Sequence, residues 1–291
     1  MKTVIVSGAT GLLGRSVLER LENEDVRVIA LQEAPELLEA TEKRTPLCFD
    51  EFFNLDENFD DVVALHLAFP RKSDEESVMG GIGFAYRFIE KACSLGANLV
   101  VETSSQSVYD IHRQNAAIES DIICPATLYG VAKAYLEDWI QDYCDKNNVK
   151  CVHLRLSSLV GPKYTVRLTC RMTQSAHSGN GLCVNNTADT FSFLHVEDCA
   201  DALITVLLSE GGKSGIYNVG TSEYYNLVDV ANVIKSKIEA NFDVDVPVEV
   251  NTSDKPGINR RVNTDKFDKA FDWKAKWNLE SIIDEEISKL I

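Results

Sequence analysis

Short apolar runs alternate along the first half of the chain with longer stretches whose apolar residues recur every three or four positions. Continuous apolar runs of this length are typical of strands buried on both faces, and the longer period predicts helices. Together they predict an α/β fold of the Rossmann type, a doubly wound parallel sheet covered by helices on both faces. The predicted strands are 4–6, 26–31, 47–49, 62–65, 99–101 and 149–154, and the predicted helices lie within 12–21, 75–95 and 126–146.

The second half of the chain is less regular. Residues 163–190 are polar and carry few signals of helix or strand. Beyond them we predict helices at 198–208, 227–238 and from 280 onwards, and strands at 216–219 and 246–250. The sequence contains no repeat and no flexible linker, so we expect two closely packed units. They are a dinucleotide-binding domain, residues 1–162 with 191–216, and a smaller mixed α/β C-terminal substrate-binding unit, residues 163–190 with 217–291.

Length and charge narrow the range of functions. The chain of 291 residues has room for about two domains. Its 45% apolar and 25% charged residues exclude a disordered or fibrous protein. Lys and Arg number 29 and Asp and Glu number 45, which gives a net charge of −16. So acidic a surface repels nucleic acid and anionic lipid, and we expect neither as the main partner.

Several features bear on the compartment. No apolar run reaches the roughly 18 residues that span a bilayer. Residues 1–8 hold one basic residue and a short apolar run that stops at glycine, unlike a signal peptide. The eight cysteines are scattered, without a Cys-x-x-Cys pair, and a chain of this length does not need disulfides. We therefore expect reduced thiols in a cytoplasmic protein, and no metal site.

Three glycines follow the first predicted strand and lead into the first predicted helix. Gly8, Gly11 and Gly14 have the spacing G-x-x-G-x-x-G. Glycine lets the backbone turn sharply and lets a pyrophosphate approach main-chain N–H groups, and the helix N-terminus adds partial positive charge. At a strand-to-helix junction this loop predicts a dinucleotide site.

The end of the second strand bears on the identity of the dinucleotide. An acidic residue there holds the adenosine ribose hydroxyls and disfavours a 2′-phosphate. This position is Gln32, followed by Glu33, and no arginine follows the strand closely. Arg15, just after the glycines, either pairs with a 2′-phosphate or lies in solvent. The sequence favours NAD and leaves NADP open.

Tyr129 and Lys133 lie four residues apart in one predicted helix and therefore share a face. A tyrosine hydroxyl has a reference pKa near 10, too high for a general base at neutral pH. A nearby ammonium and a positive nicotinamide ring favour the phenolate. Reaching neutral pH needs roughly 4 kcal/mol, which two cations in a shielded cleft can supply.

A segment rich in hydroxyl groups, residues 103–109, follows the predicted strand 99–101. Ligands of open α/β sheets bind at the carboxyl ends of the strands. A serine there can donate to a substrate oxygen while a tyrosine moves the proton. Such a segment can also simply cap the next element.

In this order and spacing, these features resemble the extended short-chain dehydrogenase/reductase superfamily, and in particular its NAD-dependent epimerase/dehydratase family. The resemblance covers nearly the whole chain. The segments that carry it are SGATGLLG at 7–14, HLA at 66–68, SSQSVY at 104–109, PATLYGVAK at 125–133, RLSSLVGP at 155–162, FLHVEDCADA at 193–202 and YNVG at 217–220.

The resemblance implies roles for individual residues. Ser105 is the expected catalytic hydroxyl, Tyr129 the acid and base, and Lys133 its modulator and an anchor for the cofactor. His195 matches a segment that joins the two units and is expected to be structural. Besides Tyr129 and Lys133, the expected cofactor contacts are Gly8, Thr10, Gly11, Leu12, Leu13, Gly14, Gln32, Asp50, Leu67, Ala68 and Arg71.

Several positions depart from the pattern of nucleotide-sugar members of the family. Phe191 lies in the stretch where an arginine usually binds the diphosphate, and Ser158 replaces a usual asparagine. Arg260 and Arg261 resemble a late phosphate-contacting arginine. The resemblance thus implies a nucleotide sugar as the substrate, at an altered site. The expected substrate contacts are Ser105, Ser158 and Arg261.

Within this class the sequence leaves epimerisation and the reduction of a carbonyl compound other than a sugar open. A dehydratase is expected to use an acidic pair beside the serine, and Gln106 disfavours it. A non-catalytic, cofactor-binding regulatory protein on the same fold is another alternative. The family often forms homodimers through the helices within 75–95 and 126–146. Four aromatic residues there could line such a contact or pack on the sheet: Phe84, Phe88, Tyr135 and Trp139.

Overall fold

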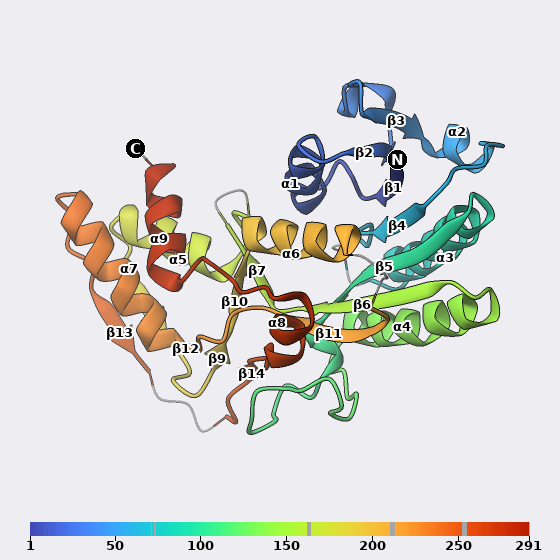
Figure 1. The fold of residues 1–291 in the computed structure, drawn as a ribbon. Coiled ribbons are helices and arrows are strands. Elements are labelled where there is room, and N and C mark those ends of the chain that lie inside the picture. The colour runs from blue at the N-terminus through green and yellow to red at the C-terminus, as the bar shows by residue number, and fades with distance from the viewer. Residues whose placement is uncertain (71, 73, 162–163, 210–212, 252–254, 291) are drawn as a thin grey trace.

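A seven-stranded parallel sheet forms the centre of the molecule (Figure 1). The computed structural model describes residues 1–290 apart from 71, 73, 162–163, 210–212 and 252–254. The strand order is β11-β6-β5-β4-β1-β2-β3, and every neighbouring pair is parallel. The strands are β1 (Lys2–Ser7), β2 (Val26–Gln32), β3 (Arg44–Cys48), β4 (Val62–His66), β5 (Ala97–Ser105), β6 (Lys150–Leu156) and β11 (Gly215–Val219).

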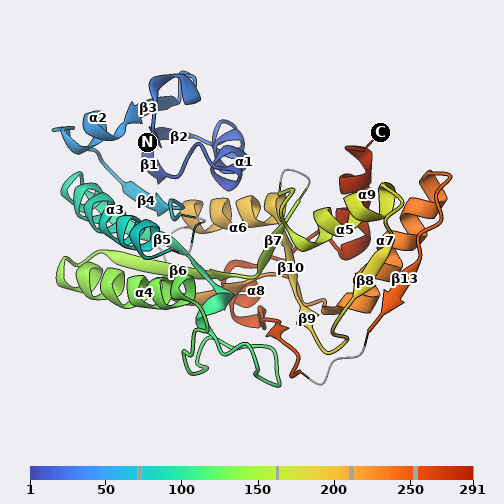
Figure 2. The ribbon, with the colours of Figure 1, turned by 180° about the vertical axis from the view of Figure 1, so that it is seen from behind.

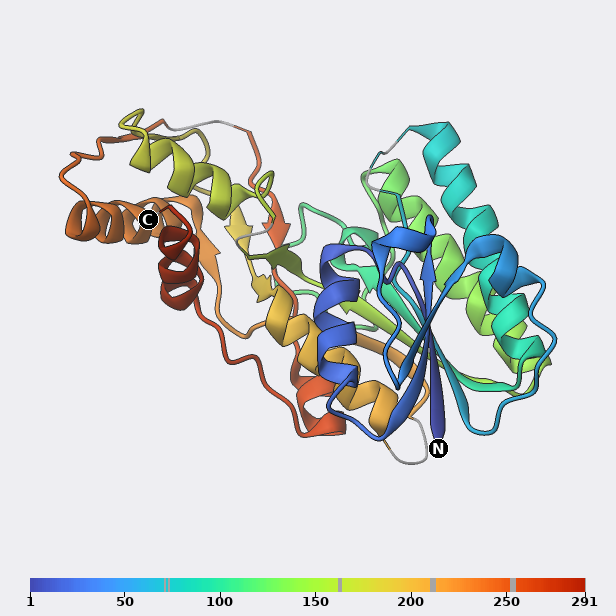
Figure 3. The ribbon, with the colours of Figure 1, turned by 90° about the horizontal axis from the view of Figure 1, so that it is seen from above.

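Helices cover both faces of this sheet, each over its own apolar core (Figure 3). One face carries α2, α3 and α4, whose apolar side chains include Phe52, Phe88 and Ile140. The other carries α1, α6 and α8, with Leu18 and Phe267 among their buried residues. The helices are α1 (Leu12–Leu21), α2 (Phe49–Phe53), α3 (Glu75–Ser94), α4 (Leu128–Lys146), α6 (Val196–Leu208) and α8 (Asp265–Phe271). Two single turns, η1 (Pro35–Leu37) and η2 (Gln106–Val108), follow β2 and β5.

A smaller unit lies beside the sheet domain (Figure 2). Its helices share a separate core that includes Ile234 and Ile283. They are α5 (Leu168–His177), α7 (Leu227–Asn241) and α9 (Leu279–Ser288). Its short strands are β7 (Ser158–Val160), β8 (Leu182–Val184), β9 (Thr190–Phe191), β10 (Phe193–His195), β12 (Tyr225–Asn226), β13 (Val248–Val250) and β14 (Asn259–Arg260). They form the small sheets β7–β10, β12–β9–β14 and β8–β13.

The strand order reverses between β1 and β4. Chain crossovers leave these two strands in opposite directions across the sheet, which opens a crevice at their carboxyl ends. The glycine loop leaves β1 at this point, and residues 67–70 leave β4 beside it. The fold therefore places the predicted dinucleotide loop where ligands of such sheets bind.

The predicted α/β fold is confirmed, and the differences lie in particular elements. The run 47–49 marks only the end of β3, because this edge strand is half-exposed and Phe49 already begins α2. The polar stretch 163–190, predicted as irregular, contains α5 and β8. The predicted domain boundary near residue 216 lies at the start of β11, and the division into domains stays a prediction. No helix in the described parts of the chain has the length and apolar character needed to cross a membrane.

Candidate active site

The glycine loop is packed so tightly that larger residues do not fit. Gly8 has φ of +71°, and a Cβ built on it would lie 2.8 Å from the Ala68 nitrogen. A Cβ on Gly14 would lie 2.2 Å from the Gly8 carbonyl oxygen. The Gly11 N–H donates to the same oxygen at 3.1 Å. The loop is thus a compact turn pressed against Leu67 and Ala68, the segment that follows β4.

The N-terminus of α1 is open for an anion. Gly11 is its N-cap residue and offers no side-chain hydrogen bond, and the first turn holds no acidic residue. The first N–H groups of a helix have no partner within the helix and carry partial positive charge. With Gly8 and Gly14 keeping side chains out of the turn, this geometry fits a pyrophosphate.

Tyr129 and Lys133 meet at the Phe69 ring. The Tyr129 ring packs edge-on against Phe69, with ring centroids 5.6 Å apart. The Lys133 Nζ atom lies 4.6 Å from the centroid of the same ring. Nζ also donates to the Thr103 carbonyl oxygen at 2.7 Å, two residues before Ser105. Tyr129 is half-buried and Lys133 is 2% exposed.

Ser105 lies two residues after Thr103, whose carbonyl oxygen accepts from Lys133 Nζ. It is the last residue of β5, half-buried, and its Oγ accepts from the Ser107 N–H at 3.1 Å. Helix α4 packs closely on the turn η2 that follows Ser105, since a Cβ on Gly130 would lie 2.4 Å from the Ser107 carbonyl oxygen. We call Ser105, Tyr129 and Lys133, with Phe69, the reaction site.

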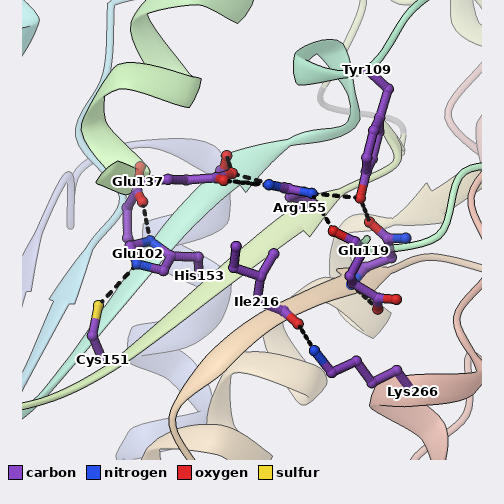
Figure 4. A network of polar contacts seen from close by, with 11 residues as sticks. Glu102, Tyr109, Glu119, Glu137, Cys151, His153, Arg155, Ile216 and Lys266 are labelled. Atoms are coloured by element: carbon purple, nitrogen blue, oxygen red, sulfur yellow. Dashed lines mark hydrogen bonds and ion pairs between the residues drawn. The ribbon is translucent and has the colours of Figure 1, made fainter. Parts of the chain in front are cut away.

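Beneath the reaction site lies a buried ion pair. Glu102 is in β5, and its Oε1 lies 3.6 Å from Lys133 Nζ. Its Oε2 accepts a hydrogen bond of 2.7 Å from His153 Nδ1 (Figure 4). Burial raises the pKa of Glu102, but the His153 hydrogen bond and the Lys133 charge outweigh it, and the pKa lies below its ordinary value. Burial, reinforced by the Lys133 charge, lowers the pKa of His66 to about 3, so this ring is neutral.

A second buried network holds the serine segment in place. Arg155, in β6, donates to both carboxylate oxygens of Glu137 and, at 2.8 Å, to the Tyr109 hydroxyl (Figure 4). That hydroxyl donates to Asn218 Oδ1 at 2.8 Å. Ser104 donates to Glu137 as well. Burial raises the pKa of Tyr109 to about 12, so its hydroxyl keeps its proton and serves as a structural link.

The predicted adenosine-side residues lie apart from the reaction site. Gln32 is 3% exposed, and its Oε1 accepts from the Leu38 N–H at 2.9 Å, so this oxygen holds the chain after β2. Asp50 is exposed in the first turn of α2. Arg15 donates to the Thr10 and Leu37 carbonyl oxygens at 3.1 and 3.2 Å. Arg15 therefore ties two loops together.

Of the remaining predicted residues, Arg71 lies outside the described residues, and the other two, Ser158 and Arg261, lie in the second unit. Ser158 begins β7, half-buried. Arg261 donates to Asn259 Oδ1 and to the Gln114 carbonyl oxygen, and its guanidinium lies 5.4 Å from the centroid of the Tyr224 ring.

His195 is fully buried and plays the expected structural part. Its Nε2 lies 2.7 Å from Glu285 of α9, and its ring stacks on Trp277 at 3.9 Å between centroids. These contacts attach the start of α6 to the C-terminal helix.

Two residues at the site, Phe69 and Glu102, were not predicted from the sequence. Phe69 carries no pattern that marks it, because its role arises from contacts with a distant helix. Glu102 did have a signal: it is a charged residue directly after the apolar run 99–101, where a parallel strand is normally apolar.

The chain belongs to the NAD dependent epimerase/dehydratase family, which matches residues 4–220. UDP-glucuronic acid decarboxylase 3 of Arabidopsis thaliana is 24% identical over 218 residues, which are 72% of this chain and 61% of that protein. A trifunctional UDP-glucose 4,6-dehydratase/UDP-4-keto-6-deoxy-D-glucose 3,5-epimerase/UDP-4-keto-L-rhamnose-reductase of the same plant is 23% identical over 267 residues. That match covers 80% of this chain and 39% of the plant protein.

Solved structures share the fold. UDP-N-acetylglucosamine 4-epimerase from Bacillus cereus superimposes with a TM-score of 0.82 at 21% identity, covering 100% of this chain and 96% of that one. UDP-glucuronic acid 4-epimerase from Bacillus cereus, in complex with UDP-glucuronic acid and NAD, gives 0.81 at 18% identity and full coverage of both chains. The chain spans 61% of the length of the first curated relatives that it matches.

Proposed function

We propose that the protein is an NAD-dependent enzyme that oxidises a hydroxyl-bearing carbon of a nucleotide sugar and reduces it again, with epimerisation as the net reaction. The observation that carries this proposal is the packing of Tyr129 and Lys133 on Phe69, which follows the segment Leu67–Ala68 that lies against the glycine loop. Lys133 also donates to the Thr103 carbonyl oxygen, two residues before Ser105. Membership of the family supports the reaction class, and the UDP-sugar relatives support the substrate class.

The loop between β1 and α1 fits the cofactor. The Gly8 and Gly14 positions admit no side chain, and the uncapped start of α1 offers N–H groups to a pyrophosphate. When bound, NAD accepts a hydride from the sugar carbon and returns it. Gln32 and Glu33, in place of a cation, favour NAD over NADP.

The side chains of the reaction site divide the proton chemistry. The Tyr129 phenolate takes the proton of the substrate hydroxyl as the carbon is oxidised, and the Tyr129 hydroxyl formed in this way gives the proton back on reduction. The Ser105 hydroxyl donates a hydrogen bond to the same substrate oxygen. The Lys133 ammonium stabilises the phenolate through its charge. Phe69 shields the pair from water by packing on both residues.

The second unit supplies cations for a diphosphate. Arg260 lies in β14 beside Phe191 of β9, in parallel register, and so offers a cation next to the position where the family arginine is missing. Burial and the neighbouring Arg167 charge lower the pKa of Arg260, which means that two cations stand close together. A cavity of about 280 Å³ lies between α5 and β8 in the same unit, with Arg171 in its wall. We place the nucleotide here, and Arg260 suits the diphosphate better than the predicted Arg261.

The residue after Ser105 argues for epimerisation rather than elimination. Dehydration needs an acid and a base beside the serine, and this chain has Gln106 and Ser107 there. Gln106 is 4% exposed and has no carboxyl group that could exchange a proton. Reduction of a carbonyl compound uses the same three residues and differs in consuming the cofactor.

Replacing Tyr129 by phenylalanine tests the assignment. The purified protein with NAD is incubated with a panel of UDP-sugars, and products are separated by chromatography. We expect epimers to accumulate without net formation of NADH in the wild type, none in Tyr129→Phe, and equal NAD affinity in both by calorimetry. Stoichiometric conversion of NAD to NADH would indicate net oxidation of the substrate, and stoichiometric consumption of NADH in a parallel incubation would indicate a reductase. Near-normal turnover by Tyr129→Phe, or a wild type that binds NAD and converts nothing, would refute the proposal.

We also propose a homodimer through α3 and α4. Leu128, Val131 and Tyr135 lie at i, i+3 and i+7 on α4 and are 40%, 49% and 48% exposed. Phe88, by contrast, is buried against the sheet. A monomer in sedimentation at micromolar concentration would refute the dimer. None of the eight cysteines, all of which the structure describes, forms a disulfide, and this supports a reducing compartment such as the cytoplasm.

A further inference from the structure

A fully buried carboxylate stands behind the reaction site. Glu102 has no exposed surface, and His66 of β4, on the adjacent strand, is equally buried. Burying an ion in a protein core is costly unless the ion is paired and hydrogen-bonded. Glu102 has one hydrogen-bond partner and one ion-pair partner. His153 forms a hydrogen bond to Oε2, whereas Lys133 stands at ion-pair distance from Oε1.

Glu102 is held from behind by a chain of buried groups on β6. A hydrogen bond with Cys144 and burial raise the pKa of the Cys151 thiol well above its ordinary value, so the thiol keeps its proton. Cys151 Sγ lies 3.2 Å from His153 Nε2, on the side of the ring opposite to the Nδ1 that donates to the Glu102 carboxylate. The order of thiol, imidazole and carboxylate is that of a nucleophilic triad, but Cys151 is fully buried and cannot meet a substrate.

Lys133 has few other groups to balance its charge. From β4 it faces His66, which is neutral, and Phe69 beyond it; from β5 it faces Glu102 and the Thr103 carbonyl oxygen. Its own helix contributes Tyr129. Among the described residues, the carboxylate of Glu102 is the one anion within 4 Å of the ammonium. Glu102 is therefore the counter-ion of Lys133 in the described part of the chain.

We propose that Glu102 is a positioning residue of the reaction site: fixed by His153, its carboxylate is the counter-ion that keeps Lys133 charged and held at the end of β5. The role rests on the proposed function, since Lys133 acts on Tyr129 only if Tyr129 moves the proton. Glu102 itself touches neither cofactor nor substrate. It acts through Lys133.

The first test compares pH profiles of turnover. In Glu102→Gln the buried ammonium has lost its anion, so charged Lys133 becomes harder to maintain as the pH rises. We expect the alkaline limb of the kcat profile to move to lower pH by about one unit or more, which corresponds to a tenfold loss of kcat at the alkaline end. We expect little change of kcat at the acid end. Glu102→Asp, which keeps the charge, should restore the limb. The matched control is Glu137→Gln, a buried carboxylate whose partner is Arg155.

Two outcomes of this test would overturn the proposal. One is an unmoved alkaline limb in Glu102→Gln, even if its melting temperature falls. The other is an equal movement in Glu137→Gln, which would reveal a general effect of core damage rather than an effect through Lys133.

The second test needs no turnover, so an inactive protein would refute the proposed function and leave this pairing testable. Thermal unfolding is measured for Glu102→Gln, Lys133→Met and the double variant. If the carboxylate and the ammonium are paired, the double variant should lose less free energy of unfolding than the two single variants lose in sum. The reason is that each single variant leaves one buried charge without its partner. A Glu102→Gln chain that folds only together with Lys133→Met supports the pairing equally. Additive losses would overturn it.

Discussion

Replacing Gly14 by alanine places a methyl group inside the glycine loop. The new Cβ would lie 2.2 Å from the Gly8 oxygen and 2.7 Å from the Ala9 oxygen, closer than the 3.0 Å below which real Cβ contacts essentially never fall. Both obstacles are backbone atoms, which cannot rotate away as side chains do. The loop would have to open by most of an ångström. Overpacking of this kind costs about 1–3 kcal/mol, which for a chain of this size lowers the melting temperature by roughly 2–8 °C.

Binding of the cofactor should suffer more than stability. The N–H groups that meet the pyrophosphate belong to the turn that has to open, and a misplacement of about 1 Å can cost on the order of 100-fold in a positioned site. We expect NAD to raise the melting temperature of the wild type, since a ligand at about 100 times its Kd stabilises by roughly 2.7 kcal/mol. We expect no such rise for Gly14→Ala. Differential scanning fluorimetry and calorimetry measure both effects.

Gly83 offers a matched control. It also lies within a helix, α3, and a Cβ built on it meets no described atom within 4 Å. Alanine there removes the conformational cost of glycine in a helix, so Gly83→Ala should gain about 1 kcal/mol and bind NAD as the wild type does. If Gly14→Ala kept wild-type NAD affinity, or if both variants lost it alike, the reasoning about the loop would be wrong.

Further predictions concern three buried polar residues in different parts of the molecule. Tyr109→Phe removes the hydroxyl between Arg155 and Asn218 and should cost about 1–3 kcal/mol in thermal unfolding; an unchanged melting temperature would contradict the network. The lowered pKa of Glu102 means that its stabilisation is complete above the unfolded value near 4.5 and is lost as the pH falls through the lower folded value. Burial raises the pKa of Glu286, so its ionisation costs stability at neutral pH, and this cost disappears as the pH falls through the raised value. The check is the melting temperature of each variant and of the wild type between pH 3 and 7. The melting temperature of Glu102→Gln should lie below that of the wild type by an amount that shrinks as the pH falls, and any excess of Glu286→Gln over the wild type should shrink likewise. A difference for Glu102→Gln that stays constant across this range would refute the assignment.

The sheet domain could be predicted from sequence because each parallel strand is buried on both faces. That burial produces the unbroken apolar runs of β1, β2 and β4, and the helix 12–21 was predicted with the bounds that the structure has. Helix α5 could not be found in this way. It turns Thr169 and Thr173 inward, where both hydroxyls donate to the buried Glu286 carboxylate. A helix whose buried face is polar has no apolar period.

That Tyr129 and Lys133 share one helix could be predicted because their spacing is local, one helical turn within α4. Ser105, the last residue of β5, was expected from the family resemblance, and the catalytic roles of all three residues stay predictions. Gln32 shows the opposite case, since its carbonyl oxygen is taken by the Leu38 N–H, a contact that no spacing rule reveals. The pairing of Glu102 with Lys133 likewise needs the order of the strands, which brings β5 under α4.

The two buried ion pairs of α4 differ in a way that fits separate tasks. Arg155 and Glu137 are joined by several direct hydrogen bonds, which satisfies both groups and fixes the backbone of the serine segment. Lys133 and Glu102 stand 3.6 Å apart, and Glu102 Oε1 has no hydrogen-bond partner among the described residues. A pair held for stability alone gains from complete hydrogen bonding, because an unsatisfied buried acceptor costs about 1–3 kcal/mol. If the Lys133 ammonium also serves the reaction site, it cannot direct all of its N–H groups to Glu102. An Oε1 atom of Glu102 without a hydrogen-bond partner is the result expected from these two tasks.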